Sequence, residues 1–189
     1  IEGLDVLDTN IRMLDQSRIG SILTGDKEAL ENGQNVYGMI IQNTNPLIVA
    51  PESSLVRKGF SREDLFVCVH EQFMTETAKY ADIILPATTF VEHDDIYIAG
   101  GHQHITFGPK LINPIGEAKS NHYVLQELAK RLGAKHKGFE MTEREIIDWT
   151  LKSSNHGSLI NIEKNGWKDL QPDFNSSHFI NGFGHADKK

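Results

Sequence analysis

Polar side chains that could bind a ligand follow two neighbouring apolar segments of the sequence. Asn45 comes shortly after the first segment, and His70 with Glu71 closes the second. If the segments are parallel strands, their carboxyl ends share one sheet edge, where open α/β sheets bind ligands. A carboxylate there can accept hydrogen bonds from two ribose hydroxyls, and a helix that opens at Thr75 suits a phosphate. The pattern favours a nucleotide-like ligand; the competing interpretation is that Thr75 caps a helix while Asn45 and Glu71 stabilise turns.

A metal site is a second interpretation of the polar residues. His93, Asp94 and Asp95 are possible ligands, and His102 and His104 would face the same side of a strand. A metal-dependent hydrolase built on these groups would carry bound metal. Because the groups are scattered over expected loops, a solvated polar hairpin is the commoner explanation.

Nucleophilic catalysis finds no candidate in this sequence. Cys68 is the single cysteine and lies inside an apolar run, so we expect a buried thiol. One cysteine excludes an intrachain disulfide and a cysteine-rich metal cluster. The sequence has neither a Gly-x-Ser-x-Gly elbow nor a Gly-x-Gly-x-x-Gly fingerprint. We therefore assign no catalytic residue and no metal ligand to this chain.

The composition is that of a globular protein. The chain has 189 residues, of which 39% are hydrophobic and 24% are charged, enough for a sizeable core. A net charge of −7, from 19 basic and 26 acidic residues, disfavours a nucleic-acid partner. The sequence contains no apolar run long enough to predict a membrane span.

The elements that must position the polar residues alternate between apolar runs and helical segments. This order predicts an α/β, Rossmann-like, mostly parallel sheet with helices on both faces. We also expect a loop or hairpin excursion and a loosely ordered C-terminal tail. The expected strands are 36–41, 65–69 and 83–85, the expected helices are 26–31, 52–58, 75–80, 121–132 and 142–151, and the excursion includes 96–107.

The chain divides into three expected segments. Residues 1–35 form a lead-in, residues 36–152 an α/β dinucleotide-binding domain, and residues 153–189 a linker toward a further domain. The tail is rich in Asn, Gly, Ser and His. The first residues show neither an initiating methionine nor a signal-peptide pattern, so we expect a piece of a longer chain.

Three motifs form a longer pattern that local chemistry alone does not explain. They are Asn43-x-Asn45-Pro46, the ordered run from Glu71 to Glu92 that contains Ala-Asp-Ile-Ile-Leu-Pro-Ala-Thr-Thr, and the segment Gly-Glu-Ala-Lys-Ser-Asn ending at Asn121. Together they resemble the dimethyl sulfoxide reductase family of molybdenum enzymes, which includes formate dehydrogenases and nitrate reductases. The similarity covers roughly residues 15–135.

The resemblance implies the third domain of a larger catalytic subunit. In that family this α/β domain binds the guanosine end of one molybdopterin guanine dinucleotide, within a bis-molybdopterin guanine dinucleotide cofactor that holds molybdenum or tungsten. The family's metal ligand and iron–sulfur cysteines lie outside the matching segment, so the segment alone is expected to be inactive and to retain no cofactor. Its partners would be the remaining domains of the same subunit. The alternative is a free-standing nucleotide-binding or assembly module without redox activity.

The resemblance also assigns roles to particular positions. His70 and Glu71 match a strand-end pair near the guanosine, where Glu71 replaces the commoner aspartate. His93 falls where a lysine often approaches the nucleotide, and Asn121 falls where an aspartate often contacts guanine. An amide accepts from the guanine N1 and N2 donors less strongly than a carboxylate does. The expected cofactor-binding residues are Asn45, His70, Glu71, Thr75, His93 and Asn121.

Overall fold

The computed structural model describes residues 10–187, which form two compact units. We call residues 10–89 and 114–128 the sheet unit, and residues 90–113 and 129–187 the hairpin unit. Helix α4, Asn121–Leu132, begins in the sheet unit and ends in the hairpin unit. Within residues 10–187, every helix is too short or too polar to cross a membrane.

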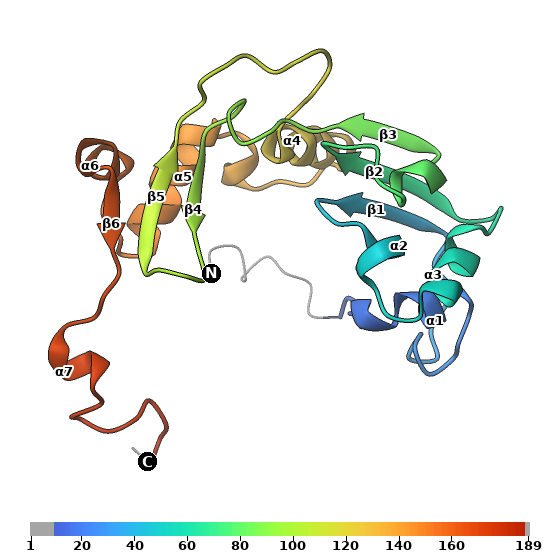
Figure 1. Ribbon diagram of the computed structural model, residues 1–189, viewed down its shortest axis with the longest axis horizontal. Helices are drawn as coiled ribbons and strands as arrows, with labels where there is room; N and C mark the ends of the chain where they lie inside the picture. Colours follow the sequence, from blue (N-terminus) through green and yellow to red (C-terminus); the bar gives the residue numbers. More distant parts are fainter. Residues whose placement is uncertain (1–9, 188–189) are drawn as a thin grey trace. The chain divides into compact units, whose positions relative to one another are not determined.

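The sheet unit is built on three parallel strands in the order β1-β2-β3 (Figure 1). They are β1, Gly38–Gln42, β2, Phe66–Glu71, and β3, Ile83–Pro86. Ile41 pairs in register with Val69, and Val69 pairs with Ile84. A parallel bridge from Ala87 to Lys119 brings the segment before α4 to the end of β3. The predicted α/β fold with a parallel sheet is confirmed.

One face of the sheet carries the core of this unit. Ile41, Val67 and Val69 are buried because alternate side chains of a strand point to the same face. They pack with apolar residues of the short helices, among them Leu23 and Leu47. Those helices are α1, Ile19–Leu23, α2, Pro46–Val49, α3, Ser53–Phe60, and η3, Ala78–Tyr80. The short helix η2, Gln16–Arg18, precedes α1 and contributes no buried residue.

The other face of the sheet is more exposed than its apolar sequence indicates. Ile40 is 59% exposed, Phe66 is 48% exposed and Ile83 is 46% exposed. These residues alternate with the core-facing ones, so they share the second face. Cys68 and His70 also alternate with the core residues but are buried. Burial on this face therefore increases toward the carboxyl edge of β2.

The hairpin unit contains an antiparallel sheet in the order β4-β5-β6. The excursion predicted at 96–107 forms a hairpin of β4, Asp95–Ile98, and β5, His104–Gly108. A core of Ile105, Ile147, Leu151, Leu159 and Ile162 joins this sheet to two helices. The other elements are η4, Lys137–Phe139, α5, Glu143–Ser153, α6, Leu159–Asn165, β6, Trp167–Asp169, and α7, Phe174–Ser177.

Two elements of the hairpin unit bear on the sequence predictions. The helix predicted at 142–151 is present as α5 and begins with a capping box, because Thr142 accepts from the Glu145 amide and the Glu145 carboxylate accepts from the Thr142 amide. The tail differs from the loosely ordered segment that we expected, since α6 packs in the core and β6 pairs with β5. The boundaries at residues 36 and 152 stay predictions.

Two predicted helices are wrong in the sheet unit. The helix expected at 75–80 is only the 3-10 turn η3. The chain returns at once to the sheet, where the backbone amide of Asp82 donates to the Val67 carbonyl, so a longer helix cannot form. The helix expected at 26–31 is a set of turns. A helix cannot continue through this segment because Glu31 and Asn32 adopt left-handed backbone conformations, with φ of 51° and 59°.

Candidate ligand site at the carboxyl edge of the parallel sheet

A hydrogen-bonded network around the buried side chain of His70 lies at the carboxyl ends of β1 and β2. His70 is fully buried, and its Nδ1 lies 3.0 Å from Nε2 of Gln42. Nε2 of His70 lies 3.1 Å from the carbonyl oxygen of Lys119. The Gln42 amide also donates to Oδ1 of Asn121 over 3.1 Å. The network therefore joins two strand ends to the start of α4.

The start of α4 is fixed by local chemistry. Ser120 is buried, and its Oγ accepts from the backbone amide of Tyr123. Serine is a preferred helix N-cap because its side-chain oxygen satisfies an otherwise unpaired amide. Asn121 is thus held as the first residue of the helix, partly exposed at the sheet edge.

A second set of bonds clamps the loop after β1 to the loop after β2. Oδ1 of Asn45 accepts from both the backbone amide and the hydroxyl of Thr77, at 3.2 and 2.7 Å. The Thr77 hydroxyl accepts in turn from the backbone amide of Leu47 at 3.1 Å. Thr77 is fully buried, so the clamp is shielded from water. Thr75 caps the turn that follows, since its Oγ1 accepts from the Ala78 amide.

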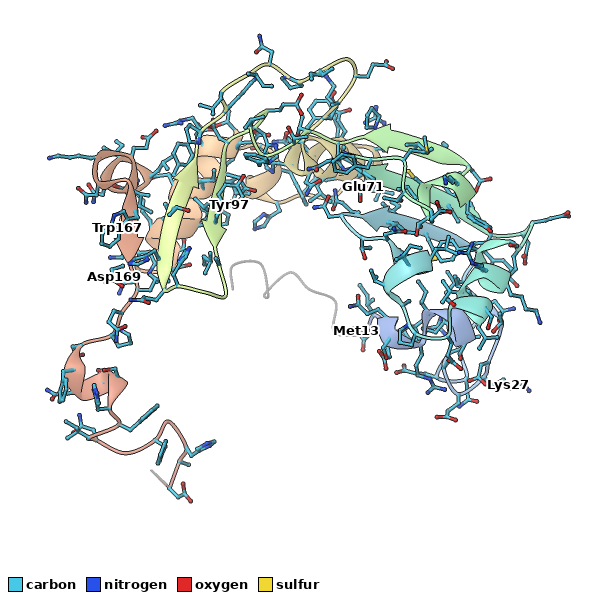
Figure 2. All side chains as sticks on the ribbon, in the orientation of Figure 1. Met13, Lys27, Glu71, Tyr97, Trp167 and Asp169 are labelled. Carbon is cyan, nitrogen blue, oxygen red and sulfur yellow. The ribbon has the colours of Figure 1, made fainter. Side chains whose placement is uncertain are left out.

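Glu71 is the last residue of β2 and is partly exposed (Figure 2). One of its carboxylate oxygens, Oε1, accepts from the backbone amide of Gln72 at 2.7 Å. Its backbone carbonyl accepts from the Ala87 amide, so the residue stays attached to the sheet. This geometry leaves a carboxylate at the edge next to buried His70.

The structure separates the six predicted residues into two groups. It brings Asn45, His70, Glu71, Thr75 and Asn121 to the same edge of the sheet unit. His93 belongs instead to the hairpin unit, where its Nε2 lies 3.8 Å from a carboxylate oxygen of Asp95.

The metal interpretation gains no support from the geometry. Among residues 10–187, no group of three or more His, Cys, Asp or Glu side chains is arranged to hold a metal ion. The rings of His102 and His104 lie 5.4 Å apart, and His104 packs edge-on against Trp167. These histidines form a ring cluster on the antiparallel sheet.

Cys68 lies beside the site on β2 and serves as a probe of it. The thiol is buried, as predicted, and burial raises its pKa because the thiolate loses its hydration. Alkylating reagents react with the thiolate. A buried thiol can be labelled only when the sheet unit opens. The labelling rate of this single cysteine, measured against urea concentration, would therefore report that opening.

Sequence reasoning missed two members of the network. Gln42 is the polar residue that follows the apolar run 36–41, just as His70 follows the apolar run 65–69. The same signal could therefore have identified both residues. Lys119 contributes a backbone carbonyl, which every residue has, so its side chain gives no signal. Gln42 also lines a groove of about 540 Å³ that follows β1, a volume within the usual range for ligand pockets.

Replacing Thr77 by valine is expected to lower the free energy of unfolding of the sheet unit by about 2 kcal/mol. The change keeps the shape but removes two buried hydrogen bonds, each worth about 1 kcal/mol. The measurement is the urea dependence of Cys68 labelling. Thr77→Ser keeps the hydroxyl and should recover at least half of the loss. Equal losses in the two variants would contradict the clamp.

Comparison with known proteins places this arrangement in a family. A family model described as molybdopterin oxidoreductase matches residues 19–131, more than half of the chain. The probable oxidoreductase YoaE of Bacillus subtilis (strain 168) is 36% identical over 152 residues, covering 80% of this chain and 22% of that protein. The F420-dependent formate dehydrogenase subunit alpha of Methanocaldococcus jannaschii is 34% identical over 103 residues, covering 54% of this chain and 15% of that protein.

A solved structure supports the same fold. Acetylene hydratase from Pelobacter acetylenicus superposes with a TM-score of 0.64 at 24% identity, over 81% of this chain and 21% of that one. The chain spans less than a quarter of the length of each of these three proteins. The family match and the shared fold agree with the resemblance carried by the sequence motifs. This chain belongs to the molybdopterin oxidoreductase family.

Proposed function

We propose that this chain is part of the catalytic subunit of a molybdenum-dependent oxidoreductase, in which it binds the guanosine portion of a molybdopterin guanine dinucleotide. Membership of the family implies a molybdopterin cofactor, and the relatives include a formate dehydrogenase subunit and a nitrate reductase subunit. The observation that carries the proposal is that Glu71 and Asn121 lie with His70 at one sheet edge. Glu71 follows His70 in the chain, and Asn121 is linked to His70 through the Gln42 amide.

The residues at this edge fit a nucleoside. Glu71 offers a carboxylate that can accept from ribose hydroxyls, and Asn121 offers an amide for a base. Both side chains are partly exposed. His70 is fully buried and Oδ1 of Asn45 is taken by Thr77, so we give these two residues the role of holding the edge in shape.

The cofactor, when bound, supplies the redox chemistry, and this chain supplies binding and orientation. Thr75 shapes the turn after β2 through its bond to the Ala78 amide. For His93 we propose a contact with the nucleotide because it matches the family position where a lysine often approaches the nucleotide. The remaining domains of a longer subunit are the proposed partners, and the isolated chain is expected to be inactive.

The test is a titration of the chain with GMP and with dGMP, which lacks the ribose 2′-hydroxyl. A carboxylate that accepts from the ribose should make GMP bind about tenfold more tightly, since a hydrogen bond to a charged group contributes about 1.5 kcal/mol or more. Glu71→Ala should weaken GMP binding by about the same factor and remove the difference between the two nucleotides.

The matched control is Glu76→Ala, which removes a carboxylate from the same loop. Glu76 forms an ion pair with Lys79 and takes no part in the network. Its replacement should leave both affinities unchanged. Unchanged GMP binding after Glu71→Ala, or equal binding of GMP and dGMP by the unaltered chain, would contradict the proposed contact between Glu71 and the ribose.

A further inference from the structure

The direction of the hydrogen bonds around His70 decides which atoms the site presents to a base. We propose that Gln42 holds the Asn121 amide with its N–H groups outward, so that the site reads an acceptor atom of the base, such as O6 of a 6-oxopurine. This inference rests on the proposed nucleoside site and defines its specificity.

The first step is the tautomer of His70. The carbonyl oxygen of Lys119 can only accept, and it lies 3.1 Å from Nε2 of the ring. Nε2 must therefore carry a proton. A neutral imidazole then has a lone pair on Nδ1, which can only accept.

The second step is the orientation of the Gln42 amide. The Gln42 atom that faces Nδ1 of His70 must be a donor. It is therefore the amide nitrogen of Gln42, which lies 3.0 Å from Nδ1. The same NH₂ group donates its second hydrogen to Oδ1 of Asn121, and the nitrogen and oxygen lie 3.1 Å apart. Turning either amide over would set two donors or two acceptors face to face, at a cost comparable to a lost buried hydrogen bond. The carbonyl of Lys119 thus fixes three side chains in sequence.

The third step is what Asn121 has left to offer. Its Oδ1 is occupied by Gln42, and no hydrogen bond within residues 10–187 involves its Nδ2. The residue is partly exposed, so the NH₂ group is available to a ligand. A donor at this place can bind O6 or N7 of guanine, which are acceptors, and cannot bind the N1 and N2 donors. Asn121 then makes no hydrogen bond to the 2-amino group of guanine.

The chain should therefore bind GMP and IMP alike, because IMP differs from GMP only by lacking the 2-amino group. We expect the two dissociation constants to agree within about twofold. Two variants should reverse the polarity. Asn121→Asp places an acceptor outward directly. Gln42→Glu replaces the donor by an acceptor, so Nδ1 of His70 must take a second ring proton to pair with the new carboxylate. Asn121 must then turn its NH₂ group inward and present Oδ1 outward.

Both variants should favour GMP over IMP by about tenfold, the discrimination usual for one added base contact. The charge-matched control is Gln72→Glu, which adds a carboxylate at the same edge without a bond to Asn121. The Gln72 side chain bonds the Thr88 carbonyl instead. Its GMP to IMP ratio should stay near one. A tenfold preference for GMP in the unaltered chain, or an unchanged ratio in both reversing variants, would overturn the proposal.

A second measurement separates this proposal from the proposed function. Nitrogen-15 NMR at alkaline pH, where an imidazole is neutral, reports which ring nitrogen of His70 carries the proton. A proton on Nε2 supports the relay whether or not a nucleotide binds, and a proton on Nδ1 overturns it. Failure of both GMP and IMP to bind would instead count against the nucleoside site, and leave the relay to be decided by the His70 spectrum.

Discussion

Gly59→Ala is expected to lower the free energy of unfolding of the sheet unit by about 3 kcal/mol. In an open helix the same change stabilises by about 1 kcal/mol, because alanine is the better helix former. Here Gly59 lies in α3 against α1, and an added Cβ would overlap Cβ of Leu23, which is 1% exposed. Cβ of Leu23 is bonded directly to the backbone Cα, so rotating the Leu23 side chain cannot relieve the overlap. Overpacking of this kind costs about 1–3 kcal/mol or more.

The measurement is the urea midpoint of Cys68 labelling, with far-UV circular dichroism as a second probe. The control is Gly38→Ala, because a Cβ at Gly38 meets nothing within 4 Å. That variant should leave the midpoint unchanged or raise it slightly. A stabilised Gly59→Ala protein would mean that α1 and α3 are not held this closely in solution.

The parts of the fold that sequence predicted best are those fixed by local patterns. Helix α4 was predicted with both ends correct, because a serine cap precedes it and Gly133 follows it. The three parallel strands were predicted to within two residues, since each is an apolar run bounded by polar turns. Local chemistry decides these elements almost alone.

The predictions failed where distant contacts decide the outcome. The segment after Glu71 has helix signals, but the pairing of Asp82 with Val67 across the sheet returns the chain before a helix can form. Likewise, Gln42 gained its importance from bonds to residues 28 and 79 positions away. Such separations have no local periodicity, so a single sequence cannot reveal them.

The candidate site shows the same division. The strand-end rule found Glu71 and His70, because parallel strands always end at one edge. It could not show that His70 is buried and that Glu71 remains partly exposed. Two neighbouring residues of similar character therefore receive different roles, one inside the network and one facing a ligand.

His70→Leu is expected to lower the free energy of unfolding by about 3 kcal/mol. The substitution removes the bond to the Lys119 carbonyl and leaves the Gln42 NH₂ group without one acceptor. Each lost bond contributes about 1 kcal/mol, and a partly buried donor without an acceptor adds a further cost of about 1 kcal/mol. The Lys119 carbonyl keeps its bond from the Thr88 amide, which limits the loss on that side.

The matched variant for this prediction is His70→Gln, whose amide can donate to the Lys119 carbonyl and accept from Gln42 at the same time. It should retain more than half of the stability that His70→Leu loses, as measured by Cys68 labelling against urea. If the two variants lose the same amount, shape rather than hydrogen bonding holds this edge. Recovery in the glutamine variant would mean that the direction of two hydrogen bonds, set by one backbone carbonyl, stabilises the edge on which Glu71 and Asn121 stand.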